Sequence, residues 1–185
     1  MTLPCAALND PEMQALVDAL TSPGVPSIAN APPAALRALL AAMRPTDVQP
    51  LALVRDEQIP RGDGTSLSIR HYVPDGAGLA TILYFHGGGW VVGSVDDYDH
   101  VTRLLAVRTG CTVISVDYRL APEHPFPAAV EDAWLAVRTL ADQTKLLIVA
   151  GDSAGGNLST VITHMARDAG SPPLAGQILL YPMVE

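Results

Sequence analysis

The chain has 185 residues, of which 49% are hydrophobic and 16% are charged. This length and composition suffice to bury one continuous core, which excludes a disordered protein. The formal net charge is −8 and the basic residues are scattered singly. That pattern excludes the basic face of a protein that binds nucleic acid or an anionic lipid surface.

The sequence does not predict export or membrane insertion. Residues 1–10 lack the basic and apolar regions of a secretory signal, and no apolar run reaches the length of a membrane span. Cys5 and Cys111 are the only cysteines in the sequence, too few for a disulfide framework, so we expect both to be reduced thiols. These features predict a cytoplasmic protein.

Two amphipathic helices are expected first, over residues 11–20 and 32–43. A stretch rich in proline and glycine, residues 21–33, separates them. We assign residues 1–50 to an N-terminal helical cap segment. Such a pair of helices could lie over a site as a lid or could cover an edge of a sheet.

The rest of the chain predicts an α/β fold. Strands over residues 54–60 and 67–73, joined by a turn with two glycines, suit an antiparallel hairpin. Apolar strands then alternate with helices, which indicates a mostly parallel sheet covered on both faces. The strands are expected at 81–85, 112–116, 146–150 and 177–181, and the helices at 97–108, 127–140 and 154–169. The last of about six strands is expected at a sheet edge, and the chain looks cut short after it.

The strongest motif is Gly-Asp-Ser-Ala-Gly at residues 151–155, between an apolar strand and a helix. A G-x-S-x-G sequence in this context predicts a sharp turn that exposes the Ser153 hydroxyl above the sheet. Glycines at positions 151 and 155 suit the turn because larger side chains would collide with the backbone. The following helix begins beside Ser153, where free N–H groups favour negative charge.

A second motif, His-Gly-Gly-Gly-Trp at residues 86–90, directly follows another apolar strand. Consecutive glycines let main-chain N–H groups point at a reacting carbonyl, as in the H-G-G-G loop of an oxyanion hole. We expect the donors to be the N–H groups of Gly88, Gly89 and Ala154. Trp90 offers a large apolar wall for part of a substrate, although core packing would explain it nearly as well.

These two motifs, with Asp-Tyr-Arg-Leu-Ala-Pro-Glu-His-Pro-Phe-Pro at residues 117–127, resemble the hormone-sensitive lipase family of esterases. The resemblance runs from about residue 54 to residue 182. It implies an α/β-hydrolase fold, with residues 51–185 as an incomplete catalytic domain, and a carboxylesterase for short to medium acyl chains. It implies that Ser153 is the nucleophile, with no metal or other cofactor. Six further residues support the two turns in this family: His86, Gly87, Gly151, Asp152, Gly155 and Gly156.

Residues 117–127 are interpreted as scaffolding. We expect Arg119 to pair with Glu123 across the proline-bounded turn, because the two are close in sequence. Asp117 ends a strand, where it can accept N–H groups from the next loop.

An α/β-hydrolase triad needs an acid and then a histidine after the serine, and this chain has no matching positions. His164 follows Ser153 in the same helix, about 16 Å along its axis, so it cannot reach the hydroxyl. Asp168 and Glu185 also do not fit. We give His86 little weight as a substitute base. Without a base, a serine hydrolase loses about 10⁶ in kcat, so the chain alone is expected to be nearly inactive.

Three interpretations therefore remain. The favoured one is a piece of an ester hydrolase that acts on a small-molecule ester, completed by a C-terminal segment or another chain. The second is a non-catalytic receptor for a small ligand on the same fold. The third is a fragment that associates through its exposed last strand, with a partner or as a homo-oligomer.

Overall fold

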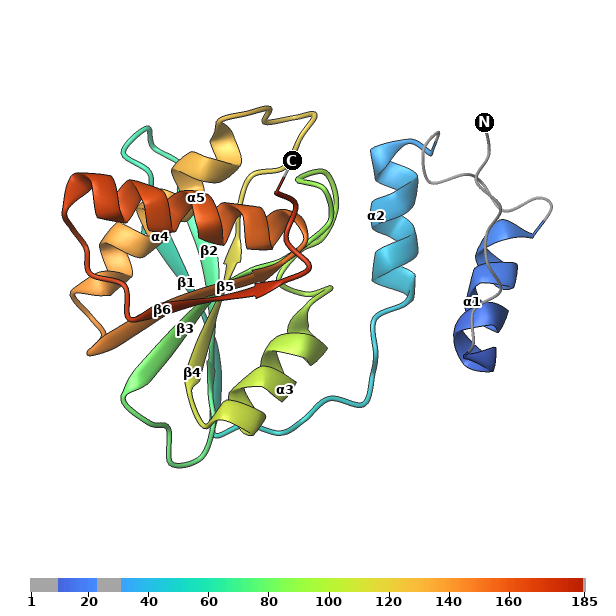
Figure 1. Cartoon of the computed structure of the whole chain (residues 1–185), viewed down its shortest axis with the longest axis horizontal. Helices are drawn as coiled ribbons and strands as arrows, with labels where there is room; N and C mark the ends of the chain where they lie inside the picture. Colours follow the sequence, from blue (N-terminus) through green and yellow to red (C-terminus); the bar gives the residue numbers. More distant parts are fainter. Residues whose placement is uncertain (1–9, 23–30, 185) are drawn as a thin grey trace.

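A six-stranded sheet forms the centre of the computed structural model, which describes residues 10–22 and 31–184 (Figure 1). Residues 1–9, which include Cys5, and part of the proline- and glycine-rich stretch lie outside the described residues. The strands follow the order β1-β2-β4-β3-β5-β6 across the sheet. Their bounds are Leu53–Pro60 (β1), Ser66–Val73 (β2), Ala80–Phe85 (β3), Thr112–Asp117 (β4), Leu146–Asp152 (β5) and Gly176–Leu180 (β6).

The sheet has an antiparallel start and a parallel remainder, as predicted. Strands β1 and β2 form a hairpin, and β2 also pairs antiparallel with β4. Strands β4, β3, β5 and β6 are parallel, with β6 at the edge. Because the carboxyl ends of parallel strands meet at one edge, the loops after β3 and β5 emerge side by side, with Phe85 in register with Gly151.

Helices cover both faces of the sheet (Figure 1). On one face lie α4 (Ala128–Ala141) and α5 (Ala154–Ala169), packed on Leu83, Phe85 and Val149. On the other lies α3 (Asp99–Thr109), which packs with Ile82 and Tyr84. Alternate residues of β3 thus serve opposite cores, which explains why this strand is buried on both faces and mostly apolar.

Two N-terminal helices precede the sheet, α1 (Pro11–Thr21) and α2 (Pro33–Ala42), within one or two residues of the predicted ranges. Figure 1 shows α2 between α1 and the sheet. Helix α2 contains no buried residue, so apolar burial contributes little to its position. Across the described residues, we find no helix with the length and apolar character needed to span a membrane.

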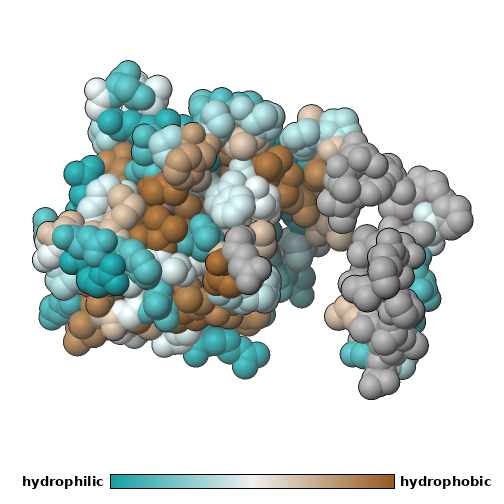
Figure 2. All heavy atoms as spheres, turned by 45° about the horizontal axis from the view of Figure 1, so that its top comes forward, coloured by the Kyte–Doolittle hydropathy of each residue, from teal (hydrophilic) through white to brown (hydrophobic). Residues whose placement is uncertain are grey.

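The surface of the sheet portion is mixed in character. Figure 2 shows patches of hydrophobic residues separated by hydrophilic ones. Several of the exposed apolar side chains belong to the edge strand β6 and the residues after it: Ile178, Leu180, Tyr181, Met183 and Val184. Within the described residues β6 is an edge strand, as predicted, and it carries apolar side chains on its surface.

Asp132 of α4 is the most deeply buried carboxylate in the described ion pairs, at 1% side-chain exposure. It accepts hydrogen bonds from Arg61 of the β1–β2 turn (2.8 Å) and from the side chain of Arg119 (3.0 Å). Burial acts to raise the pKa of Asp132, but the hydrogen bonds from the two arginines outweigh it and hold the pKa below its usual range. These three charged side chains therefore connect the hairpin, the loop after β4 and helix α4.

The predicted pairing of Arg119 with Glu123 is wrong. Arg119 bonds Asp132 and Glu131 instead, and Glu123 pairs with Arg37. Arg119 pairs with Asp132 because a buried carboxylate is costly without hydrogen-bond donors. The Glu123 side chain is 54% exposed, so water can supply its donors. Asp117 accepts the N–H of Val95 (3.3 Å), so its donor comes from the loop after β3 and not from the loop that follows it.

Replacing Asp132 with alanine should lower the free energy of unfolding by about 3–5 kcal/mol, because both arginines lose a buried partner. The stabilisation by Asp132 should be present above the unfolded-state pKa of about 3.9 and be lost as pH falls through the lowered folded-state pKa. Urea unfolding across pH measures both effects. Asp168→Ala is the control, because that carboxylate is 67% exposed and pairs only with an exposed arginine. Equal losses in the two variants would contradict the assignment.

Candidate active site

The turn between β5 and α5 holds Ser153 in a strained backbone conformation. Its φ of 48° and ψ of −115° are uncommon for any residue other than glycine. The Ser153 N–H donates to the carbonyl of Leu180 (2.9 Å), and the Ser153 carbonyl accepts the N–H groups of Asn157 and Met183 (both 3.1 Å). These bonds hold the strained conformation in place, because they connect the turn to α5, to the end of β6 and to the chain that follows it.

Close backbone packing explains the glycines of this turn. A Cβ at Gly155 would overlap the carbonyl oxygen of Phe85, and one at Gly151 would overlap the backbone of Gly155. At Gly156 a Cβ would come within 2.9 Å of the Pro182 side chain. Because Phe85 belongs to a central strand, its carbonyl cannot move away without disturbing the sheet, and the turn lies directly on the carboxyl end of β3.

The glycine loop after β3 is turned by internal hydrogen bonds. The carbonyl of Gly88 accepts the N–H groups of Val91 and Val92 (both 3.0 Å), and a Cβ at Gly88 would overlap the Val92 carbonyl. Gly88 has a φ of 116°, which glycine alone adopts readily. Within the described residues, the amides of Gly88, Gly89 and Ala154 donate to no other group. Three main-chain donors are thus available beside the Ser153 turn.

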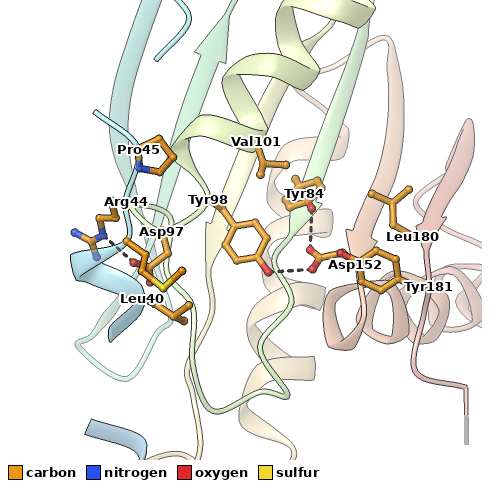
Figure 3. Close-up of a pocket in the computed structure, with 11 residues that line it drawn as sticks. Leu40, Arg44, Pro45, Tyr84, Asp97, Tyr98, Val101, Asp152, Leu180 and Tyr181 are labelled. Carbon is orange, nitrogen blue, oxygen red and sulfur yellow. Dashed lines mark hydrogen bonds and ion pairs between the residues drawn. The ribbon is translucent and has the colours of Figure 1, made fainter. Parts of the chain in front are cut away.

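Asp152 joins the two turns through its carboxylate. Oδ1 accepts the N–H of Gly87 (2.9 Å) and the hydroxyl of Tyr84 (2.8 Å), and Oδ2 accepts the hydroxyl of Tyr98 (2.9 Å; Figure 3). Burial, followed by the neighbouring Asp152 charge, raises the pKa of both tyrosines. Their hydroxyls therefore remain protonated donors. A cavity of about 350 Å³ opens beside this cluster, with Tyr181 on its wall.

His86 is fully buried at the start of the glycine loop. Its ring stacks on Tyr118 (centroids 4.3 Å apart), and its Nδ1 lies 2.7 Å from the carbonyl of Gly87. The Tyr118 hydroxyl donates to the His86 carbonyl (2.7 Å). Burial lowers the pKa of His86, so the ring is neutral at pH 7. These contacts hold the glycine loop in place, and they engage His86 Nδ1 with the carbonyl of Gly87.

Trp90 lies on the wall of a second cavity, about 540 Å³ in volume, on the other side of the glycine loop. The lining is mainly apolar and includes Phe126, Val130 and Val161, with Asn157 among the polar groups. Trp90 also packs on the main core and has a φ of 60°, so it contributes to the core and to the cavity wall at once. The cavity has the size and apolar character of a small-molecule pocket.

Other candidate residues are not brought to this site. His164 is exposed on α5, and in the described part of the chain no histidine side chain bonds the Ser153 hydroxyl. Cys111 is half-buried at the start of β4, next to the carbonyl of Thr109. Among residues 10–22 and 31–184, no group of three or more histidine, cysteine, aspartate or glutamate side chains is placed to hold a metal.

Sequence reasoning missed the two tyrosines and the arginine that bonds the glycine loop from α2. Tyr84 could have been noticed, because a hydroxyl in an otherwise apolar buried strand needs a partner. The acidic residue inside the Ser153 motif also needs donors once it is buried. Nothing in the sequence near Tyr98 or Arg37 signals their partners, which lie more than fifty positions away.

Comparison with known proteins agrees with this geometry. A family described as having the alpha/beta hydrolase fold matches residues 82–185. Carboxylesterase NlhH of Mycobacterium tuberculosis is 38% identical over 98% of this chain and 60% of its own length. Esterase LipI of the same organism is 51% identical over 59% of this chain and 36% of its own length. The solved structure of a hyperthermophilic esterase from the archaeon Pyrobaculum calidifontis is 41% identical, with a TM-score of 0.81 over 95% of this chain and 59% of that one.

The chain therefore belongs to the α/β-hydrolase family, in the group similar to hormone-sensitive lipase, as the sequence motifs predicted. The two Mycobacterium tuberculosis relatives are named as a carboxylesterase and an esterase. The chain spans about 60% of the length of the first relatives it matches.

Replacing Gly155 with alanine should destabilise the fold by about 1–3 kcal/mol, because the new methyl group meets the Phe85 carbonyl at the end of a central strand. Gly176→Ala is the matched control, since a Cβ there meets nothing within 4 Å. Thermal unfolding of both variants measures the difference. Equal unfolding temperatures for Gly155→Ala and Gly176→Ala would contradict the close contact between the turn and the Phe85 carbonyl.

Proposed function

We propose that this chain carries the nucleophile and the oxyanion hole of a carboxylic ester hydrolase. Ser153 attacks the ester carbonyl to form a tetrahedral intermediate, which then collapses to an acyl-enzyme as the alcohol leaves. The observation that carries the proposal is the strained Ser153 turn, which lies on the end of β3 beside a glycine loop whose amides donate to no other group among the described residues. Strain at a polar residue of this kind is typical of catalytic positions.

The proposed oxyanion hole consists of the N–H groups of Gly88, Gly89 and Ala154. These donors are main-chain groups held by the sheet and by α5, so they need no reorganisation during the reaction. Ala154 is the first residue of α5, where the helix dipole adds to the stabilisation of negative charge. The loss of one such donor typically costs about 10²–10³ in kcat.

The proposed substrate is a small ester with a short to medium acyl chain. The names of the relatives, carboxylesterase and esterase, support the ester class. The apolar cavity beside Trp90 has room for an acyl or alcohol group and offers few charged partners. Residues 1–50 are proposed as a cap over the catalytic portion, residues 51–185.

The general base and its acid are proposed to come from polypeptide outside these 185 residues, either downstream in the same protein or in another chain. His86 is buried against its own loop, and His164 is exposed on α5, so neither suits the role. An acyl transfer without its base retains only about 10³–10⁴ over water. The chain by itself should therefore turn over esters very slowly.

The direct test compares this chain with a version extended through its downstream reading frame, each beside Ser153→Ala. The extended protein should hydrolyse p-nitrophenyl acetate and butyrate, and Ser153→Ala should lower kcat by about 10⁶. A fluorophosphonate probe followed by mass spectrometry should label Ser153 alone. Activity that survives the substitution, or a label elsewhere, would refute the proposal. Ester binding without turnover would favour a receptor on the same fold.

Asp152 should act as a positioning residue for the oxyanion hole. Asp152→Asn in the extended protein should lower kcat by about tenfold to a hundredfold, because Gly87 loses its charged acceptor and the following amides move. Tyr98→Phe removes one donor to the same carboxylate and should give a smaller loss with KM unchanged. Tyr72→Phe is the control, since that buried hydroxyl donates to the Val95 carbonyl (3.5 Å) and makes none of the bonds to Asp152 described above. Equal kcat values in all three variants would rule out this role.

A further inference from the structure

Helix α2 is held to the rest of the protein by arginines rather than by a core. None of its residues is buried, and the side chains of Leu39 and Met43 are more than half exposed. A helix with so little apolar burial needs other contacts to keep one position. Its described bonds to the sheet portion come from Arg37 within the helix and from Arg44 just after it.

Arg37 makes four hydrogen bonds to two separate loops. Nε donates to the carbonyl of Val91 (2.9 Å), and Nη2 donates to the carbonyl of Ala121 (2.9 Å). Nη1 and Nη2 also form a bidentate pair with the Glu123 carboxylate (2.9 and 2.8 Å). Only the planar fork of a guanidinium matches carbonyls and a carboxylate in this way, so lysine could not replace it.

The two loops that Arg37 bonds are themselves joined beside the site. Val91 lies two residues after Gly89, at the exit of the glycine loop. Next to it, the Trp90 carbonyl accepts the N–H of Ala121 (2.8 Å). One guanidinium thus connects α2 to the segment that leaves the proposed oxyanion hole and to the loop that follows β4.

The chain just after α2 is bonded to the loop before α3. Arg44 Nε pairs with Asp97 (2.7 Å), one residue before Tyr98. Between the two arginines, Leu40 and Met43 form part of the wall of the cavity beside Asp152. Figure 3 shows Leu40 and Arg44 on one side of that cavity and Tyr181 on the other. Movement of α2 would therefore open the cavity without disturbing the sheet.

We propose that Arg37 is a positioning residue that latches α2 against the exit of the glycine loop and so sets the size of the cavity beside Asp152. The expected effect of Arg37 on substrates rests on the proposed function. Its effect on α2 is independent of any reaction. Because the Arg37 and Glu123 side chains are partly exposed, salt weakens the latch while the apolar core is unaffected.

The first test measures hydrogen–deuterium exchange by mass spectrometry on the chain and its variants. Arg37→Ala should raise exchange of the α2 amides at least tenfold, and Glu123→Gln and Arg37→Lys should raise it less. Peptides from β4 and β5 should exchange as in the unsubstituted chain. Arg167→Ala removes an equally charged but exposed residue on α5 and should leave α2 unchanged.

A second arm uses substrates of increasing size with the extended protein. Arg37→Ala should change KM for p-nitrophenyl octanoate several-fold more than for the acetate, with kcat for the acetate within about twofold of the unsubstituted enzyme. If the extended protein hydrolyses no ester, the proposed function fails, and the exchange result alone decides on the latch. Unchanged α2 exchange in Arg37→Ala, or faster exchange spread evenly over the whole chain, would overturn the latch.

Discussion

The seating of the Ser153 turn on the end of β3 is the constraint on which the rest of the site depends. Gly155 lies so close to the Phe85 carbonyl that no side chain fits between them. This contact brings the loop after β3 and the turn after β5 together as one rigid unit, because both strands are central and parallel. The strained Ser153 backbone persists since the surrounding sheet and helix leave it no alternative.

Asp152 extends that unit from backbone to side chains. Its carboxylate takes one main-chain and two hydroxyl donors and has no cationic partner in the described ion pairs. Three neutral donors satisfy the buried charge, and the two hydroxyls among them keep their protons because burial and the Asp152 charge raise the pKa of both tyrosines. The tyrosines come from β3 and from the residue before α3, so both hydroxyl donors reach this carboxylate from the face of the sheet that α3 covers.

The sequence predicted the backbone arrangement well and the side-chain partners poorly. Apolar periodicity located all six strands and the described helices, since burial of one face or two decides the period. The two glycine motifs located the turns because steric exclusion leaves a clear residue pattern. The partner of Arg119 was missed because proximity in sequence favoured Glu123, whereas burial of Asp132 decides the pairing. Burial at that level is a property of the assembled fold, and a single sequence does not display it.

The two sides of the site are stabilised by different forces, and this difference has consequences for its dynamics. The sheet side is stabilised by buried apolar residues and close backbone contacts, which salt does not screen. The α2 side rests on guanidinium bonds of partly exposed side chains, whose net strength falls as salt screens them. Ser153 and the glycine amides, which the proposed function requires to keep their relative positions, all lie on the sheet side. Leu40 and Met43, which line the cavity beside Asp152, lie on the α2 side. Under the proposed function, one fold thus holds the reacting centre still while the cavity beside it adjusts.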